Sequence, residues 1–185
     1  MRRLPGVLSV VALGILATGT TAQERPDFSG AWTSGPARAT RGGQGGGAPS
    51  GSLGSGWGQE FTITQDMHGL SVGRVFFSPG DLQPSLKFHY SLEGSETRNA
   101  VLMGRGFQEQ VSKTAWQSDK LVITTVHSFV NPEDGQPMTS EVRRTLSLQP
   151  SRSPSRPPTL MIETVRGGVL GGPSSSTRTV YARRR

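Results

Sequence analysis

The chain contains no cysteine in its 185 residues. Disulfides, thiolate metal sites, a cysteine nucleophile and a lipid-modified cysteine anchor are therefore excluded. Aromatic residues are also few, at 6% of the sequence, whereas glycine and proline contribute 25 and 13 residues. This composition favours turns and short strands, and no segment beyond the N-terminal region shows a helical period. Stability must come from a packed core alone.

The N-terminus has the pattern of a cleavable export signal. Positively charged Met1-Arg2-Arg3 precedes an apolar stretch over 7–17 and a run of small residues that ends at Ala22. The apolar stretch is shorter than the roughly 20 residues that a spanning helix needs. We expect a signal peptide over 1–22 and one mature domain over 23–185, without a transmembrane segment, in the periplasm or outside the cell.

The formal net charge of +7 comes mainly from single arginines, and the one basic run is Arg183-Arg184-Arg185 at the C-terminus. A nucleic-acid surface would combine clustered basic residues with stacking aromatics, so we expect no nucleic-acid partner. Weak attraction of this basic tail to an acidic envelope surface remains an open alternative.

From residue 60 onward the sequence consists of short alternating runs separated by turn residues, which is typical of antiparallel β-structure. The clearest run places four apolar residues on one face of a strand: Leu86, Phe88, Tyr90 and Leu92. Nine or ten sequential strands predict an all-β, up-and-down meander that forms a barrel or a strongly curled sheet.

The glycine-rich stretch at about 33–58 predicts a flexible loop, because it cannot bury enough apolar surface to offset the entropy of ordering it. Trp57 lies within it. This tryptophan either folds the loop back onto the barrel mouth or is an exposed aromatic residue.

The opening segment Phe28-Ser29-Gly30-Ala31-Trp32 resembles the Gly-x-Trp start of the lipocalin and fatty-acid-binding families. In these families the first-strand tryptophan closes one end of a barrel. Together with the segments at 62–66, 90–96 and 115–123, the chain is similar to a group of uncharacterised exported bacterial proteins with a lipocalin-like, or calycin-like, β-fold. The resemblance implies no established activity. It implies a cation over the tryptophan, for which Arg178 and Arg183 are the candidates.

One stretch matches a catalytic pattern: Gly69 to Gly73 reads Gly-x-Ser-x-Gly, with Ser71 as a candidate nucleophile and His127 downstream. Asp81 and Asp119 lie between them. The nucleophile elbow requires a strand that turns sharply into a helix, and the residues after Gly73 do not form a helical pattern. We therefore interpret Ser71 as a polar position in a strand.

The three histidines, His68, His89 and His127, could ligate a metal only if the fold brought them together, because none forms a closely spaced pair. We expect no metal site and no other cofactor.

Five aromatic residues could line a ligand cavity or simply fill the core: Trp32, Phe88, Tyr90, Trp116 and Tyr181. We favour non-enzymatic binding of a small apolar or amphipathic molecule. The alternatives are an envelope-associated structural or interaction module and a serine hydrolase that uses Ser71.

Overall fold

The computed structural model describes residues 25–34, 56–74, 86–103, 106–131, 134–151, 155–167 and 172–184. These residues contain ten strands and no helix. The strands are β1 (Gly30–Thr33), β2 (Glu60–Gln65), β3 (Gly69–Arg74), β4 (Leu86–Ser91), β5 (Thr97–Met103), β6 (Gly106–Gln117), β7 (Lys120–Val130), β8 (Pro137–Gln149), β9 (Thr159–Arg166) and β10 (Ser175–Arg183). The predicted signal peptide over 1–22 and residues 35–55 of the predicted loop lie outside the described residues.

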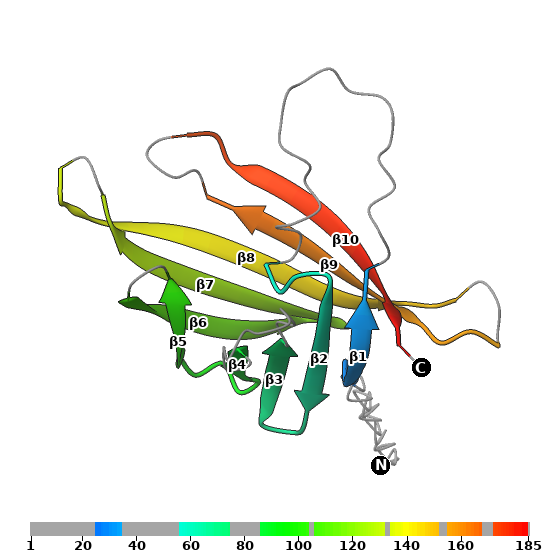
Figure 1. Ribbon diagram of the computed structural model, residues 1–185. Coiled ribbons are helices and arrows are strands. Elements are labelled where there is room, and N and C mark those ends of the chain that lie inside the picture. Colours follow the sequence, from blue (N-terminus) through cyan, green and yellow to red (C-terminus); the bar gives the residue numbers. More distant parts are fainter. Residues whose placement is uncertain are drawn as a thin grey trace, which may run out of the picture.

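The ten strands form one antiparallel sheet in the order β4-β3-β2-β1-β10-β9-β8-β7-β6-β5. Consecutive strands pair everywhere except between β4 and β5, and β1 also pairs with β10, so that the sheet curls into a nearly closed barrel. The long strands β6 to β10 form one curved wall, and the short strands β1 to β5 form the other (Figure 1). The predicted all-β meander is thus confirmed. Within the described ranges no helix is long and apolar enough to cross a membrane.

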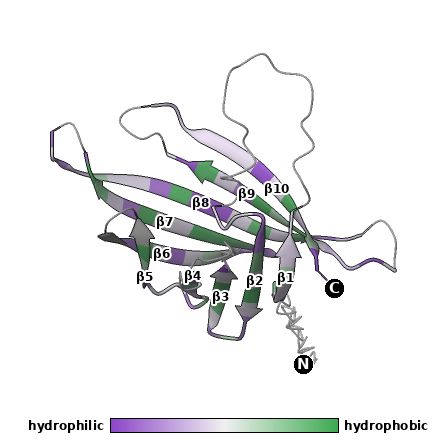
Figure 2. Ribbon diagram, viewed as in Figure 1, coloured by the Kyte–Doolittle hydropathy of each residue, from purple (hydrophilic) through white to green (hydrophobic). Residues whose placement is uncertain are grey.

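Side-chain alternation explains which residues face the barrel interior. In β4, Phe88 and Tyr90 are buried while Lys87 and His89 are exposed, as the sequence predicts. The same alternation of hydrophobic and hydrophilic residues is visible along the long strand β8 (Figure 2). Because successive side chains point to opposite faces of a strand, every strand contributes one row of residues to the interior.

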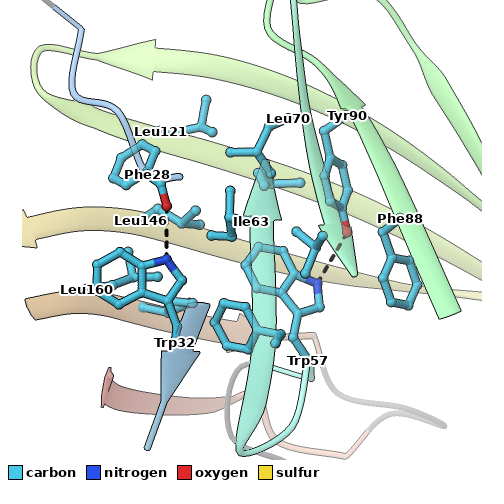
Figure 3. Close-up of a cluster of buried hydrophobic side chains, with 14 of the residues drawn as sticks. Phe28, Trp32, Trp57, Ile63, Leu70, Phe88, Tyr90, Leu121, Leu146 and Leu160 are labelled. Carbon is cyan, nitrogen blue, oxygen red and sulfur yellow. Dashed lines mark hydrogen bonds between the residues drawn. The ribbon is translucent and has the colours of Figure 1, made fainter. Parts of the chain in front are cut away.

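The core fills this interior with aromatic and aliphatic side chains (Figure 3). At one end Phe28 and Trp32 pack near the leucines Leu121, Leu146 and Leu160; we call this the Trp32 end. At the other, the Trp57 end, the ring of Trp57 lies beside Tyr90 and Phe88.

The sheet is closed at its one open seam by a side chain. β4 and β5 are the two ends of the strand order, so their facing backbones form no ladder. The buried carboxamide of Asn99 in β5 takes the place of a ladder pair: its Oδ1 accepts from the His89 N–H at 2.7 Å, and its Nδ2 donates to the His89 C=O at 2.9 Å. The Thr114 hydroxyl donates a further bond to the Ser91 C=O across the same seam.

We expect Asn99→Ala to destabilise the fold by about 1 to 3 kcal/mol, because both backbone groups of His89 lose their partner next to the core. Urea denaturation of the purified protein measures this loss. Asn99→Asp provides the matched variant, since it keeps an acceptor for the His89 N–H and loses only the donor to the carbonyl. Equal stability of Asn99→Ala and wild type would show that the seam does not depend on this side chain.

Candidate functional site

The Trp32 end of the barrel is closed by rings and a cation. Trp32 is 1% exposed, and its Nε1 donates to the Phe28 C=O at 2.9 Å. The Arg183 guanidinium lies 5.3 Å from the centre of the Trp32 indole and also donates to the Ser29 C=O at 2.6 Å. Of the two arginines considered for this place, Arg183 therefore occupies it. Arg178 lies on the outer face, 3.8 Å from a carboxylate oxygen of Glu163.

Two of the three arginines predicted as a basic tail belong to the sheet. Arg183 is the last residue of β10, and Arg184 continues the sheet: its N–H donates to the Ala31 C=O at 2.8 Å. The Arg184 guanidinium also contacts the Glu60 carboxylate at 3.2 Å. These arginines are therefore held by the first two strands of the barrel, because the register of β10 carries the chain past β1. Arg185 lies outside the described residues.

The Trp57 end is capped by the last residues of the stretch predicted as a flexible loop. Trp57 is only 1% exposed, and its Nε1 lies 3.3 Å from the Tyr90 hydroxyl (Figure 3). Its ring packs edge-on against Phe61, with 5.4 Å between the ring centres. The Tyr181 hydroxyl donates to the Gly58 C=O at 2.9 Å and fixes the backbone just after the tryptophan. Of the two alternatives for Trp57, packing at the barrel mouth is therefore the observed one, and exposure to solvent is not.

Three neighbouring strands carry inward-facing polar side chains near this end. The inward rows are Leu121, Ile123, Thr125 and His127 in β7, Val142, Arg144, Leu146 and Leu148 in β8, and Leu160, Ile162, Thr164 and Arg166 in β9. The register aligns the polar parts, because Arg144 lies opposite Thr164 and Val142 lies opposite both Thr125 and Arg166. We call Thr125, His127, Arg144, Thr164 and Arg166 the arginine cluster.

Arg144 is the most deeply buried cation of the cluster, at 6% exposure. Its guanidinium lies 5.6 Å from the centre of the Trp57 ring, and its Nη1 is 3.5 Å from the Thr125 hydroxyl. A Cβ on Gly56 would lie 2.6 Å from Arg144 Nη2 and 3.6 Å from Arg166 Nη2. Both guanidinium groups thus converge beside the backbone of Gly56. Burial lowers the pKa of Arg144, and the charge of Arg166 acts in the same direction.

Two polar atoms of the cluster have no hydrogen-bond partner among the described residues: His127 Nε2 and Thr164 Oγ1. Thr164 is completely buried, and His127 is half-buried. Burial, followed by the charges of Arg144 and Arg166, lowers the pKa of His127 below its usual value of 6.5. At neutral pH the imidazole is therefore neutral, and the cluster contains two cations and two unpartnered polar groups.

The lowered pKa of His127 predicts a loss of stability in mild acid. Below about pH 6.5, His127 is protonated in the unfolded chain but remains neutral in the folded chain. The free energy of unfolding therefore falls until the pH reaches the lower pKa of the folded state. Urea denaturation between pH 7.5 and 5.5 should show a smaller decline for His127→Gln than for wild type.

His68 gives the opposite control, because its hydrogen bond to Glu93 raises its pKa. The stability that this pair contributes is present below pH 6.5 and is lost as the pH rises through the raised folded pKa. The free energy of unfolding of His68→Gln should therefore decline more steeply toward acid pH than that of wild type.

If instead the free energies of unfolding of wild type and His127→Gln declined in parallel toward acid pH, this result would contradict the burial of a neutral imidazole at His127.

A pocket of about 500 Å³ lies at the Trp32 end, outside the barrel core. Its lining includes Trp116, one of the five aromatic candidates, together with Met67, Leu92 and polar residues of the adjoining turns. Trp116 stacks on Phe28, with 6.1 Å between ring centres, and carries the Arg25 guanidinium 5.3 Å from its ring centre. The other four candidates, Trp32, Phe88, Tyr90 and Tyr181, are buried members of the core cluster.

Ser71 lies within the regular strand β3, directly opposite His89 in β4, and its hydroxyl is 2.8 Å from His89 Nδ1. His127 is a cluster residue on β7 and contributes nothing to this pair. The sharp strand-to-helix turn of a nucleophile elbow does not occur at Ser71. Asp119 is in the β6–β7 turn, and Asp81 lies outside the described residues.

The three histidines lie in three different places. His68 pairs with Glu93 at 2.7 Å in a turn, His89 contacts Ser71 on the outer face, and His127 faces the interior. The described part of the chain contains no group of three or more histidine and carboxylate side chains that could hold a metal ion.

Comparison of the chain with protein-family models, curated protein sequences and solved structures found no match. The site therefore has to be interpreted from its own residues. The arginine cluster was not predicted from the sequence, although one of its residues follows a recognisable pattern. Arg144 falls between Val142 and Leu146 with the period of two that marks an inward-facing row.

Proposed function

We propose that this protein is an exported, non-enzymatic binding protein that holds a small amphipathic molecule inside its lipocalin-like barrel. The architecture supports such a role, because antiparallel barrels of about this size either fill with side chains or enclose one small ligand. The proposal depends on the chemistry of the interior at the Trp57 end.

One observation carries the proposal: polar and charged side chains are buried in the same interior that holds the apolar core. Burying a cation or an unpaired hydroxyl costs free energy that a barrel serving only as a stable scaffold could avoid with aliphatic residues. Arg144 and Thr164 are 6% and 0% exposed, and their cross-strand positions are adjacent. A few convergent polar groups beside apolar walls are typical of small-molecule sites.

The pocket at the Trp32 end is the weaker candidate, although its volume suits a small ligand. Its polar lining residues already hold the surrounding turns. The Asp66 carboxylate accepts from the backbone N–H groups of His68 and Gly69 at 2.8 and 2.7 Å. Gln65 accepts from the Phe28 N–H and donates to the Pro26 C=O. These residues therefore have a structural role without any ligand.

The alternative function, an envelope-associated interaction module, is less well supported by the structure than by the sequence. It relied on the basic residues at the C-terminus as a tail that could reach an acidic surface. Arg183 is bound over Trp32, and Arg184 contacts Glu60. A surface interaction would have to compete with these contacts.

Binding of a neutral, polarity-sensitive probe tests the proposed function. We expect N-phenyl-1-naphthylamine to bind the purified mature protein saturably at one molecule per chain, and decanol to displace it. Native mass spectrometry of protein purified from its own host should show an additional bound mass. Absence of saturable probe binding, together with a mass equal to that of the bare chain, would refute the proposal.

A further inference from the structure

We propose that the pocket at the Trp32 end is a second binding site, which takes a small organic cation with an apolar stem. This inference goes beyond the proposed function, because the pocket lies outside the barrel core and the ligand is of a different class. It starts from one cation of the chain itself: the guanidinium of Arg25 lies over the ring of Trp116, and both residues line the pocket.

The pocket combines apolar lining with a size that suits a small molecule. Its volume of about 500 Å³ lies within the range of small-molecule sites, roughly 300 to 1,000 Å³. Leu92 is 5% exposed and Met67 is 82% exposed, so the lining offers apolar surface both at a buried and at an open position. An alkyl group that contacts Met67 would remove this side chain from water.

The acidic residues of the lining, Asp27 and Asp66, are ionised at neutral pH. Hydrogen bonds from Ser29 lower the pKa of Asp27, with a smaller contribution from the charge of Arg183. Hydrogen bonds from two backbone N–H groups of the following turn lower the pKa of Asp66. Both of these groups bind Oδ1 of Asp66, and no described residue donates a hydrogen bond to its Oδ2. This oxygen is therefore available to a donor on a ligand.

The Arg25 guanidinium marks the position of the cationic head group. It lies 5.3 Å from the centre of the Trp116 ring, which is the geometry of a cation–π contact. Among the described residues Arg25 forms no hydrogen bond and no ion pair, and its side chain is exposed. A cation–π contact at an exposed site is weak, so a ligand cation with an apolar stem of its own can displace Arg25. The described lining then carries two negative charges and no positive one.

This charge pattern disfavours anionic and neutral ligands. An anion would be repelled by the two carboxylates, and a neutral molecule would gain the apolar contacts alone. An alkylguanidinium fits all three parts of the pocket. Its planar head takes the place of Arg25 over Trp116, its N–H groups donate to Asp66 Oδ2, and its alkyl stem contacts the apolar lining.

Butylguanidinium and butylurea test the inference, because they share a planar head and an alkyl stem but differ in charge. NMR titration of the ¹⁵N-labelled mature protein at pH 7.5 follows the backbone amides of the turn after Asp66 and the indole N–H of Trp116. We expect one butylguanidinium to bind per chain, saturably and at least about tenfold more tightly than butylurea. Trp116→Leu should abolish this preference.

Asp66→Asn should weaken the binding of butylguanidinium at least about threefold, because it removes the charge and keeps an acceptor for the backbone N–H groups of the turn. Asp134→Asn is the matched control. Asp134 also accepts a backbone N–H within a turn, at 3.0 Å from Gln136, and it lies between β7 and β8, outside the pocket lining. Its substitution should leave the affinity unchanged.

Arg25→Ala should strengthen the binding of butylguanidinium, by about two- to fivefold, because it removes the group that competes for the Trp116 ring. If Arg25 were itself a ligand-binding residue, the same substitution would weaken binding. Weaker binding by Arg25→Ala, equal binding of butylguanidinium and butylurea by wild type, or the same affinity in Asp66→Asn and Asp134→Asn would each refute the cation site.

The test is separate from that of the barrel interior. Butylguanidinium should leave bound N-phenyl-1-naphthylamine in place, and displacement of this probe would locate the cation inside the barrel and refute the inference. Failure of the probe to bind would refute only the proposed function, because the NMR titration does not use the probe. Should Trp116→Leu fail to fold by circular dichroism, the substitutions of the exposed residues Arg25 and Asp66 still decide the outcome.

Discussion

Trp57→Ala should lower the free energy of unfolding by about 3 to 5 kcal/mol, as expected when a fully buried large aromatic side chain is removed. Trp57 is 1% exposed and contacts Phe61 and Tyr90 from a position outside the regular strands. Its removal leaves a cavity at this end of the barrel, takes the ring away from the Arg144 guanidinium, and frees the Tyr90 hydroxyl from Trp57 Nε1. Urea denaturation followed by far-UV circular dichroism measures the loss.

Two further variants show whether the tryptophan stabilises by filling space. Trp57→Phe keeps an aromatic ring and gives up the contact of Nε1 with Tyr90, so it should cost clearly less than Trp57→Ala. Met67→Ala removes a large side chain that is 82% exposed, and its effect should stay within about 0.5 kcal/mol. If Trp57→Ala were as mild as Met67→Ala, the tryptophan would belong to a surface loop and not to the barrel.

The strands could be predicted from the sequence because their pattern is local. Phe88 and Tyr90 alternate with Lys87 and His89, and this period of two is sufficient to identify a half-buried strand. Most of the strand order follows, because consecutive strands of a meander pair with one another, and β4 and β5 are the exception. The end of β7 at Val130 is harder to predict, since exposed residues such as Ser128 continue the ladder without an apolar signal.

Trp57 could not be placed from the sequence because its burial depends on contacts that are distant along the chain. The residues around it are mostly glycine and serine, a composition that predicts a flexible loop. Its partners, Phe61, Tyr90 and Arg144, come from three different strands. Only the closed sheet brings those strands around one point. The bond between Asn99 and His89 across the seam is hidden for the same reason.

The arginine cluster lies between these two cases. The face on which each row lies can be predicted from the alternation within its own strand. Thr125 and His127 continue the face of Ile123, and Arg166 continues the face of Thr164. Their convergence at one end also requires the register between β7, β8 and β9, which sequence patterns leave undetermined. A side-chain cluster in a barrel of this kind is therefore encoded strand by strand but becomes visible only when the strands are aligned.

Trp32→Ala should destabilise the protein to a similar extent, by about 3 to 5 kcal/mol, and should also loosen the joint that closes the barrel. The ladder between β1 and β10 consists of only two residue pairs, Trp32 with Arg183 and Thr33 with Ala182. β1 has four further pairs with β2, but these do not cross the joint to β10, which so short a ladder holds only weakly. The side chain of Trp32 adds the missing contacts, because it is buried in the core and bonds the Phe28 carbonyl.

Hydrogen exchange distinguishes this role from simple loss of core volume. In Trp32→Ala the amide protons of β1 and of the last residues of β10 should exchange faster than those of β7 and β8, because the joint opens before the rest of the sheet. Arg183→Ala removes the exposed cation over the ring and its hydrogen bond to the Ser29 C=O, and we expect a loss of about 1 to 2 kcal/mol. If Arg183→Ala proved as damaging as Trp32→Ala, the cation and not the buried indole would hold the two ends of the sheet together.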